Sequence, residues 1–149
     1  MTEGLTIREL HADDRQQWEP LWQGYLTFYK ATLPTNVTDV TWSRLLDPAE
    51  PMKGFVAERD GKLLGLAHYL YHRSTWSQTY YCYLEDLFVA PDRRAAGVGR
   101  ALIEAVEAEA HRVNATRLYW LTHESNSQAQ ILYNKVADRS GFIQYRKVL

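Results

Sequence analysis

The first half of the chain has the hydrophobic pattern of β-strands. Residues 5–10 alternate apolar and polar side chains, the period of a strand with one buried face. Residues 54–59 and 62–72 flank an Asp-Gly pair, which favours the positive φ angles of a two-residue turn and predicts a hairpin. Residues 80–89 are rich in aromatic and β-branched side chains and predict a further strand that becomes buried on both faces.

Apolar side chains recur at helical spacing in four other segments. The first stripe consists of Trp18, Leu21, Trp22, Tyr25 and Tyr29. Asp13 or Asp14 is placed to cap the start of this helix. Further helices are predicted over residues 38–46, 99–114 and 127–136.

Two more strands complete the predicted order of elements. They cover residues 117–122 and 142–148, on either side of the last helix. The order strand, two helices, three strands, helix, strand, helix, strand predicts an α/β fold with a mixed sheet. No repeat or linker interrupts it, so residues 1–149 are expected to form one domain.

Composition excludes several classes of protein. With 17 basic and 18 acidic side chains the net charge is −1, which gives no general attraction to nucleic acid. The sequence shows no secretory signal and no apolar run long enough for a membrane span. Its single cysteine cannot form an internal disulfide. We therefore expect a soluble cytoplasmic protein. His68, His72 and His123 lack a Cys or carboxylate at a recognised spacing, and no metal site is predicted. Cys82 lies among aromatic residues and is expected in the core.

A glycine-containing turn precedes the third helix. Gly97 and Gly99 would let backbone N–H groups approach an anion at the positive end of the helix dipole. Arg93, Arg94 and Arg100 add positive charge, so the turn could hold a pyrophosphate. The alternative is an ordinary tight turn with solvated arginines.

Two common nucleotide motifs do not fit this turn. A Walker A loop needs Gly-Lys-Ser/Thr, whereas Arg100 and Ala101 follow Gly99. A dinucleotide fingerprint needs a small residue where Leu102 stands.

The turn does fit another pattern, Arg94-x-x-Gly97-x-Gly99 after a strand ending Leu87-Phe88-Val89. It resembles the acyl-coenzyme A motif of the GNAT superfamily of N-acetyltransferases, and Asn126-x-x-Ala129-x-x-x-Tyr133-x-Lys135 resembles a second signature of that superfamily. The likeness covers nearly the whole chain and is greatest to the yeast histone and polyamine acetyltransferase group. It implies the GNAT fold, with acetyl-CoA as co-substrate. The residues it implies for binding acetyl-CoA are Leu87, Phe88, Val89, Arg94, Ala95, Ala96, Gly97, Val98, Gly99, Arg100, Asn126, Ala129, Tyr133 and Lys135.

The resemblance also implies catalytic roles. Glu85 is the candidate base, and the alternative is that it only attracts a cationic substrate. Asp86 would point to the opposite face of a regular strand, but a bulge could exchange the two carboxylates. Tyr133 is the candidate acid for the departing thiolate, unless it is simply a core residue. The N–H of Phe88 or Val89 is the candidate oxyanion donor.

The acceptor is expected to be a cationic primary amine. An aromatic and acidic rim for it could be formed by Tyr25, Phe28, Tyr29, Asp47, Glu50 and Glu124, with Glu85 as a further substrate-binding residue. Alternatively, the three aromatic residues simply belong to the buried stripe of the first helix. We expect an N-acetyltransferase for a small molecule such as a polyamine or an amino acid. The alternatives are a protein-lysine acetyltransferase and a non-catalytic acyl-CoA-binding module.

The end of the chain departs from the family pattern. Residues 136–140 delay Gly141-Phe142, and only one strand fits after them where the family has a hairpin. An unpaired strand edge favours association, and the resemblance implies dimerisation through that end, so we expect a homodimer.

Overall fold

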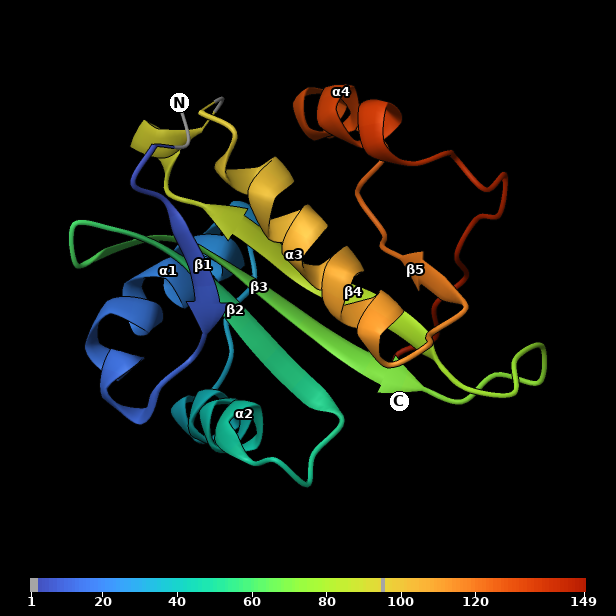
Figure 1. Cartoon of the computed structure of the whole chain (residues 1–149), viewed down its shortest axis with the longest axis horizontal. Helices are drawn as coiled ribbons and strands as arrows, with labels where there is room; N and C mark the ends of the chain where they lie inside the picture. Colours follow the sequence, from blue (N-terminus) through green and yellow to red (C-terminus); the bar gives the residue numbers. More distant parts are fainter. Residues whose placement is uncertain (1–2, 95) are drawn as a thin grey trace.

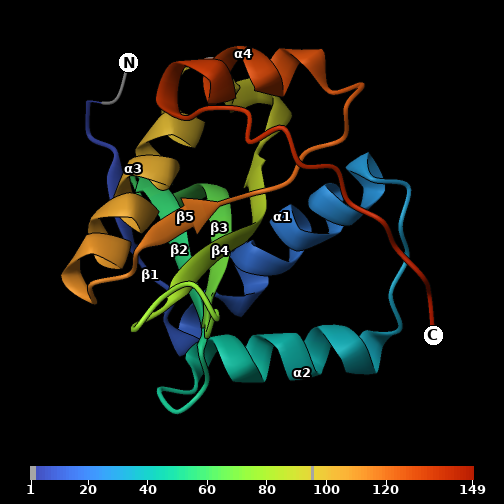
Figure 2. The same ribbon diagram turned by 90° about the vertical axis from the view of Figure 1, so that its right-hand side faces the viewer.

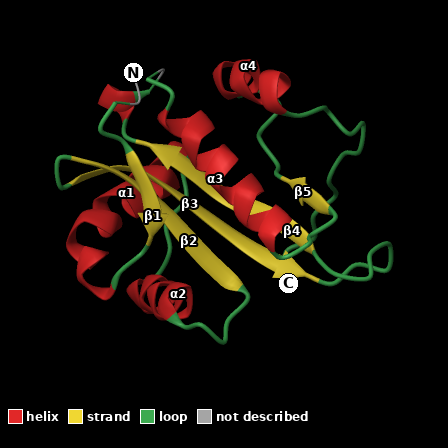
Figure 3. Cartoon of the chain, in the orientation of Figure 1, coloured by secondary structure: helices red, strands yellow, loops and turns green. Residues whose placement is uncertain are grey.

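The computed structural model describes residues 3–94 and 96–149, and these residues form one five-stranded sheet (Figure 3). The strands are β1 (Thr6–Glu9), β2 (Met52–Arg59), β3 (Lys62–His72), β4 (Tyr81–Val89) and β5 (Arg117–Tyr119). They lie in the order β1-β2-β3-β4-β5, and every pair is antiparallel except β4–β5. The helices are α1 (Arg15–Phe28), α2 (Thr35–Leu46), α3 (Val98–Arg112) and α4 (Ser127–Val136), with 3-10 turns η1 (Ala12–Asp14) and η2 (Pro91–Arg93). The predicted mixed α/β fold is confirmed.

Helices cover both faces of the sheet (Figures 1 and 2). We call the two faces the α1 face, covered by α1 and α2, and the α3 face, covered by α3. One core cluster joins Trp18, Leu21 and Trp22 to the α1 face, as their stripe predicts. A second cluster joins α3 to the opposite face and contains the fully buried Cys82, which confirms its predicted place.

Two local interactions fix α1 against the sheet. The predicted Asp-Gly turn is confirmed, with φ of 52° at Asp60 and 76° at Gly61, and the Gln17 side chain bonds to Gly61 O and Leu63 N. Asp14 occupies the N-cap position of α1 but makes no capping bond. Its carboxylate instead accepts from the Arg8 guanidinium and from the His11 N–H.

The predicted strand over residues 142–148 is wrong. This segment has no strand structure and leads away from α4 as an exposed tail (Figure 2). A strand needs a neighbour for its backbone hydrogen bonds, and the tail pairs with no strand of its own chain in the described structure. Its apolar side chains therefore stay in water, with Phe142 82% and Tyr145 90% exposed.

Among the helices of the described residues, none combines the length and the apolar character that crossing a membrane would require.

Candidate active site

A β-bulge in β4 sets the directions of Glu85 and Asp86. Tyr69 pairs with Leu84 and His68 pairs with Asp86, so Glu85 is an extra residue without a partner in β3. Leu84 packs in the α3-face cluster, which turns the next side chain, Glu85, to the α1 face. Because of the bulge, Asp86 also points to the α1 face, where it meets His68. Both carboxylates therefore lie on one face, rather than on opposite faces as in a regular strand.

Asp86 ends a buried chain of hydrogen bonds. Trp18 Nε1 donates to His68 Nε2 over 3.0 Å, and His68 Nδ1 lies 2.9 Å from Asp86 Oδ2. An indole N–H only donates, so Nε2 accepts and the histidine proton is on Nδ1, pointing to Asp86. No local sequence pattern predicts this chain of bonds, because Trp18 comes from α1 and Asp86 from β4, and their contact with His68 depends on the fold.

Tyrosines from α1 surround the two carboxylates. Tyr25 OH lies 3.5 Å from Glu85 O, and burial together with the Asp86 carboxylate raises the Tyr25 pKa. Burial and Asp86 also raise the pKa of Tyr29, which is 42% exposed and so lies outside the buried stripe. The pKa of Glu85 is raised first by partial burial and then by the charge of Asp86. The structure thus brings Tyr25, Tyr29 and Glu85 together, as the acceptor-site prediction requires.

β4 and β5 separate beside this site. Among the described residues they pair over Tyr81–Tyr83 and Arg117–Tyr119, and beyond this point β4 continues to Val89 paired with β3 but not with β5. We call the space beyond the paired residues the strand gap. Ala90 N–H donates to Leu64 O in β3, so by alternation the N–H of Phe88 also faces β3 and that of Val89 faces the strand gap. Of the two candidate oxyanion donors, the backbone direction favours Val89.

The glycine turn lies at the end of β4. Gly97 is the N-cap of α3 in the left-handed region, with φ of 83°, and the first N–H groups of α3 point out of the helix start. A Cβ on Gly99 would lie 3.5 Å from Leu132 and 3.8 Å from Val89, so this turn, β4 and α4 meet closely. Val98 is buried, Ala96 is partly buried and Ala95 lies outside the described residues.

The arginines of the turn are already engaged. Arg94 Nε donates to Val89 O over 3.0 Å, and its guanidinium lies over the rings of Phe28 and Phe88. Arg100 forms an i,i+4 ion pair with Glu104. Both side chains are exposed, so they can rearrange toward a phosphate at little cost.

The second signature lies on α4. Asn126 is its N-cap and accepts from the Ala129 N–H at 3.4 Å, so this amide has a structural use. Tyr133 packs edge-on against Trp120, and burial followed by the nearby Tyr29 raises its pKa to about 12. Tyr133 is therefore protonated at neutral pH, as a proton donor must be. Lys135 is exposed.

Glu124 lies in the loop before α4, and within the part of the chain that the structure describes it makes no contact with Tyr25, Tyr29 or Glu85. Its side chain is exposed, and its carbonyl accepts from the Gln130 side chain of α4. The histidines that could suggest a metal have other partners: His72 bonds Tyr119 OH, and His123 bonds Ser125.

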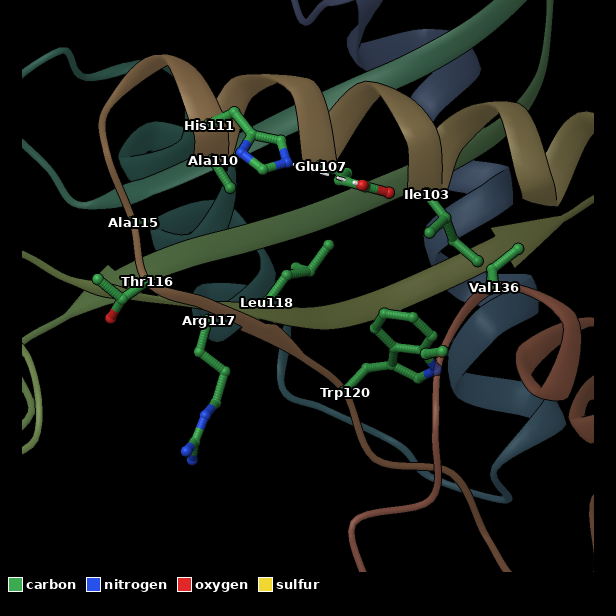
Figure 4. A pocket seen from close by; sticks show the side chains of 11 residues that line it. Ile103, Glu107, Ala110, His111, Ala115, Thr116, Arg117, Leu118, Trp120 and Val136 are labelled. Atoms are coloured by element: carbon green, nitrogen blue, oxygen red, sulfur yellow. Dashed lines mark ion pairs between the residues drawn. The ribbon is translucent and has the colours of Figure 1, made fainter.

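A pocket of about 260 Å³ lies elsewhere, between α3 and β5 (Figure 4). Leu118 and Trp120 line it from the β5 side and Ile103 from α3, while Glu107 and His111 form an ion pair at its rim. None of the candidate site residues lines this pocket, so its hollow is not the predicted acyl-CoA site.

Comparisons with known proteins agree with this architecture. The family model described as Acetyltransferase (GNAT) family matches residues 7–137. The D-amino-acid N-acetyltransferase HPA3 of Saccharomyces cerevisiae (strain ATCC 204508 / S288c) is 34% identical over 145 residues, which cover 96% of this chain and 90% of HPA3. The uncharacterized N-acetyltransferase YhfO of Bacillus subtilis (strain 168) is 27% identical, over 95% of each chain.

A solved structure has the same fold at lower identity. AAC(6')-Iy in complex with the bisubstrate analog CoA-S-monomethyl-acetylneamine superimposes with a TM-score of 0.83 at 21% identity, covering 97% of this chain and 99% of that one. The family match spans more than half of the chain, and the glycine turn that suggested the family lies within it. The chain therefore belongs to the GNAT family of acetyltransferases and is an N-acetyltransferase enzyme.

Proposed function

We propose that this enzyme transfers the acetyl group of acetyl-CoA to a primary amine of a small molecule, in the cytoplasm and by direct attack within a ternary complex. The observation that carries the proposal is that the strand gap has the candidate amine-binding residues on one side and the candidate acetyl-CoA-binding residues on the other. On the α1 face lie Glu85, Tyr25 and Tyr29, suited to a cationic amine. Beside the gap lie the α3 N-terminus and Tyr133.

The chain fits acetyl-CoA at two points. The outward N–H groups at the start of α3 suit the pyrophosphate, and Gly99 lies in this helix start beside Val89 of β4 and Leu132 of α4. The edge of β4 that faces the strand gap offers backbone groups of Leu87 and Val89 to the pantetheine arm. Acetyl-CoA supplies the activated acetyl group.

The residues then act as follows. Glu85 accepts the proton that the ammonium must lose, because a free alkyl amine has a pKa of about 10 and is mostly protonated at neutral pH. The Val89 N–H stabilises the oxyanion that forms as the amine attacks the thioester carbon. When the carbon–sulfur bond breaks, Tyr133 donates its hydroxyl proton to the thiolate, and the acylated nitrogen gives up its extra proton to restore the phenol, which leaves CoA and the neutral amide.

The first experiment measures thiol release from acetyl-CoA with acceptors of different charge. The panel contains D- and L-amino acids, spermidine, spermine, an aminoglycoside and a histone-tail peptide. Because HPA3 is named for D-amino acids, that group comes first. Turnover with a small amine above the background without acceptor supports the proposal; turnover with the peptide alone would favour a protein-lysine acetyltransferase. Binding of acetyl-CoA without turnover of any acceptor would support a non-catalytic module.

The variant Glu85→Gln distinguishes whether Glu85 acts as a general base or only binds the cationic amine. Loss of a general base lowers kcat by about 10²–10⁴-fold. A residue that only attracts the amine would instead raise the KM for the amine and leave kcat unchanged. In the active enzyme, kcat/KM should fall as the pH falls through the raised pKa of Glu85, because the carboxyl is then protonated.

We also propose that the enzyme is a homodimer joined through its C-terminal tail. The tail exposes five apolar side chains, and β5 is the last strand of the sheet as described. Their apolar surface and the free edge of β5 would be covered if the tail of a second copy lay beside β5. Light scattering should give twice the mass of the chain at micromolar concentration, and removal of residues 142–149 should give the monomer mass. A monomer for the intact chain would contradict this.

A further inference from the structure

The buried chain Trp18–His68–Asp86 has no part in the chemistry described above, although it ends one residue from Glu85. Trp18 is fully buried, and His68 and Asp86 are 3% and 9% exposed. Burying polar groups costs free energy unless they are hydrogen-bonded, and apolar side chains of the same shape are often at least as stabilising. Stability alone therefore does not explain why a tryptophan N–H, an imidazole and a carboxylate meet here.

The direction of the hydrogen bonds limits what His68 can do. Trp18 Nε1 can only donate, so it holds His68 Nε2 as an acceptor, and the single proton of the neutral ring points to Asp86. Both ring nitrogens are therefore occupied inside the protein. His68 orients Asp86 and is not placed to exchange a proton with an amine.

Asp86 in turn faces the acceptor side. One oxygen accepts from His68, and Tyr25 and Tyr29 lie near enough for the carboxylate to raise the pKa of both. The bulge puts Glu85 on the same face. Asp86 is thus held in place, whereas Glu85 is partly open to solvent and its side chain makes no hydrogen bond among the described residues.

We propose that Trp18, His68 and Asp86 are positioning residues: they hold a fixed negative charge beside Glu85, so that Asp86 attracts the ammonium group and Glu85 remains free to take its proton. The inference rests on the proposed function, with Glu85 as the proton acceptor. It assigns the two carboxylates different tasks.

The charges around Glu85 agree with this division of tasks. Asp86 raises the pKa of Glu85, after the larger effect of burial. Only a protonated His68 would oppose this effect, and the bond from Trp18 to Nε2 keeps the ring neutral. The other titratable groups that interact with Glu85 come from three elements: Tyr25 on α1, Tyr83 on β4 and Tyr119 on β5. Each is a phenol that is neutral at pH 7, so among the described residues the negative charge that acts on Glu85 is that of Asp86.

The first test replaces His68 in two ways. In His68→Gln, the amide can accept from Trp18 and donate to Asp86, so kcat should stay near that of the wild type. In His68→Leu, Asp86 loses its donor, so kcat should fall while the KM for acetyl-CoA is unchanged. If His68→Gln is as inactive as His68→Leu, the imidazole itself is required and the inference is wrong. The nitrogen NMR spectrum of wild-type His68 should show the tautomer with the proton on Nδ1, and the other tautomer would also overturn it.

The second test is Asp86→Asn, which keeps an acceptor for His68 and removes the charge. The carboxyl carbon of Glu85, followed by NMR, should titrate about one pH unit lower than in the wild type. The acid side of the kcat/KM profile should move by the same amount. Asp13→Asn, in the exposed part of the turn η1, should change neither the Glu85 titration nor the profile. An unchanged Glu85 titration overturns the inference. The NMR titration needs no substrate, so it decides the inference even if no acceptor is turned over and the proposed function fails.

Discussion

The ion-pair network of Arg8, Asp14 and Glu58 predicts a specific loss of stability in Asp14→Asn. The buried Asp14 carboxylate accepts from Arg8 Nη1 at 2.8 Å, from Arg8 Nη2 at 3.0 Å and from the His11 N–H at 2.7 Å. Asparagine keeps an acceptor for His11 but loses the charge that binds Arg8.

The size of the expected stability loss depends on the ion pair that Arg8 keeps with Glu58. Removing one partner of a buried ion pair costs about 3–5 kcal/mol when the other charge is left alone. Arg8 still has Glu58 at 3.2 Å, so we expect about 2–3 kcal/mol, the range of hydrogen bonds to charged groups. For a chain of this size that corresponds to a Tm lower by about 5–10 °C.

The effect should also depend on pH. Hydrogen bonding to Arg8 holds the pKa of Asp14 below its ordinary value of 3.8. A lowered pKa in the folded state gives stability that is complete above pH 4 and is lost as the pH falls through the folded value. Urea unfolding at pH 7 should therefore separate Asp14→Asn from the wild type, and the difference should shrink toward pH 3.

Asp13→Asn is the matched control, because Asp13 is exposed and adjacent. It should change the free energy of unfolding by less than about 0.5 kcal/mol. The reasoning would be refuted if the two variants lost equal stability at pH 7, or if the loss in Asp14→Asn were the same at pH 7 and pH 3.

Three further outcomes are expected. Tyr133→Phe should lower kcat and leave the affinity for acetyl-CoA nearly unchanged, and unchanged turnover in steady-state assays would remove Tyr133 from the mechanism. Gly97→Ala and Gly61→Ala should each lower the free energy of unfolding in urea by about 1–2 kcal/mol, because both positions have positive φ. In calorimetry, only Gly97→Ala should also weaken the binding of acetyl-CoA. Cys82 should resist alkylation in the native protein at pH 8, because burial raises its pKa to about 12. It should react once urea unfolds the chain. Rapid labelling of the native protein would contradict the buried position.

Local sequence patterns were sufficient for most of the fold. The alternation in β1, the Asp-Gly hairpin and the helical stripes each depend on residues close together in the chain. The helix α2 begins three residues before the predicted residue 38, and β5 ends three residues before the predicted residue 122. Such ends depend on what the neighbouring elements contact, and a sequence pattern does not contain that information.

The errors and omissions concern contacts between distant residues. The strand predicted over residues 142–148 has suitable side chains but no partner in the chain. The bond between Trp18 and His68 joins residues 50 positions apart, and the helical stripe identifies Trp18 only as buried. The sequence suggested the bulge at Glu85 as an alternative, but only the pairing with β3 shows which way Asp86 points.

Because of the bulge, Glu85 could be deleted without changing the pairing of the rest of β4 with β3. Before it, Cys82 and Leu84 pack against the α3 face, and after it Leu87 and Val89 do so. Deleting Glu85 would make the pairs Tyr69–Leu84 and His68–Asp86 consecutive, which is the spacing of a regular ladder, and every core residue of β4 would keep its face. Loss of one codon would thus leave the fold intact and remove the proposed base. The same step in reverse, one codon inserted into a regular strand, would place a second carboxylate on the α1 face of a chain that already had the fold.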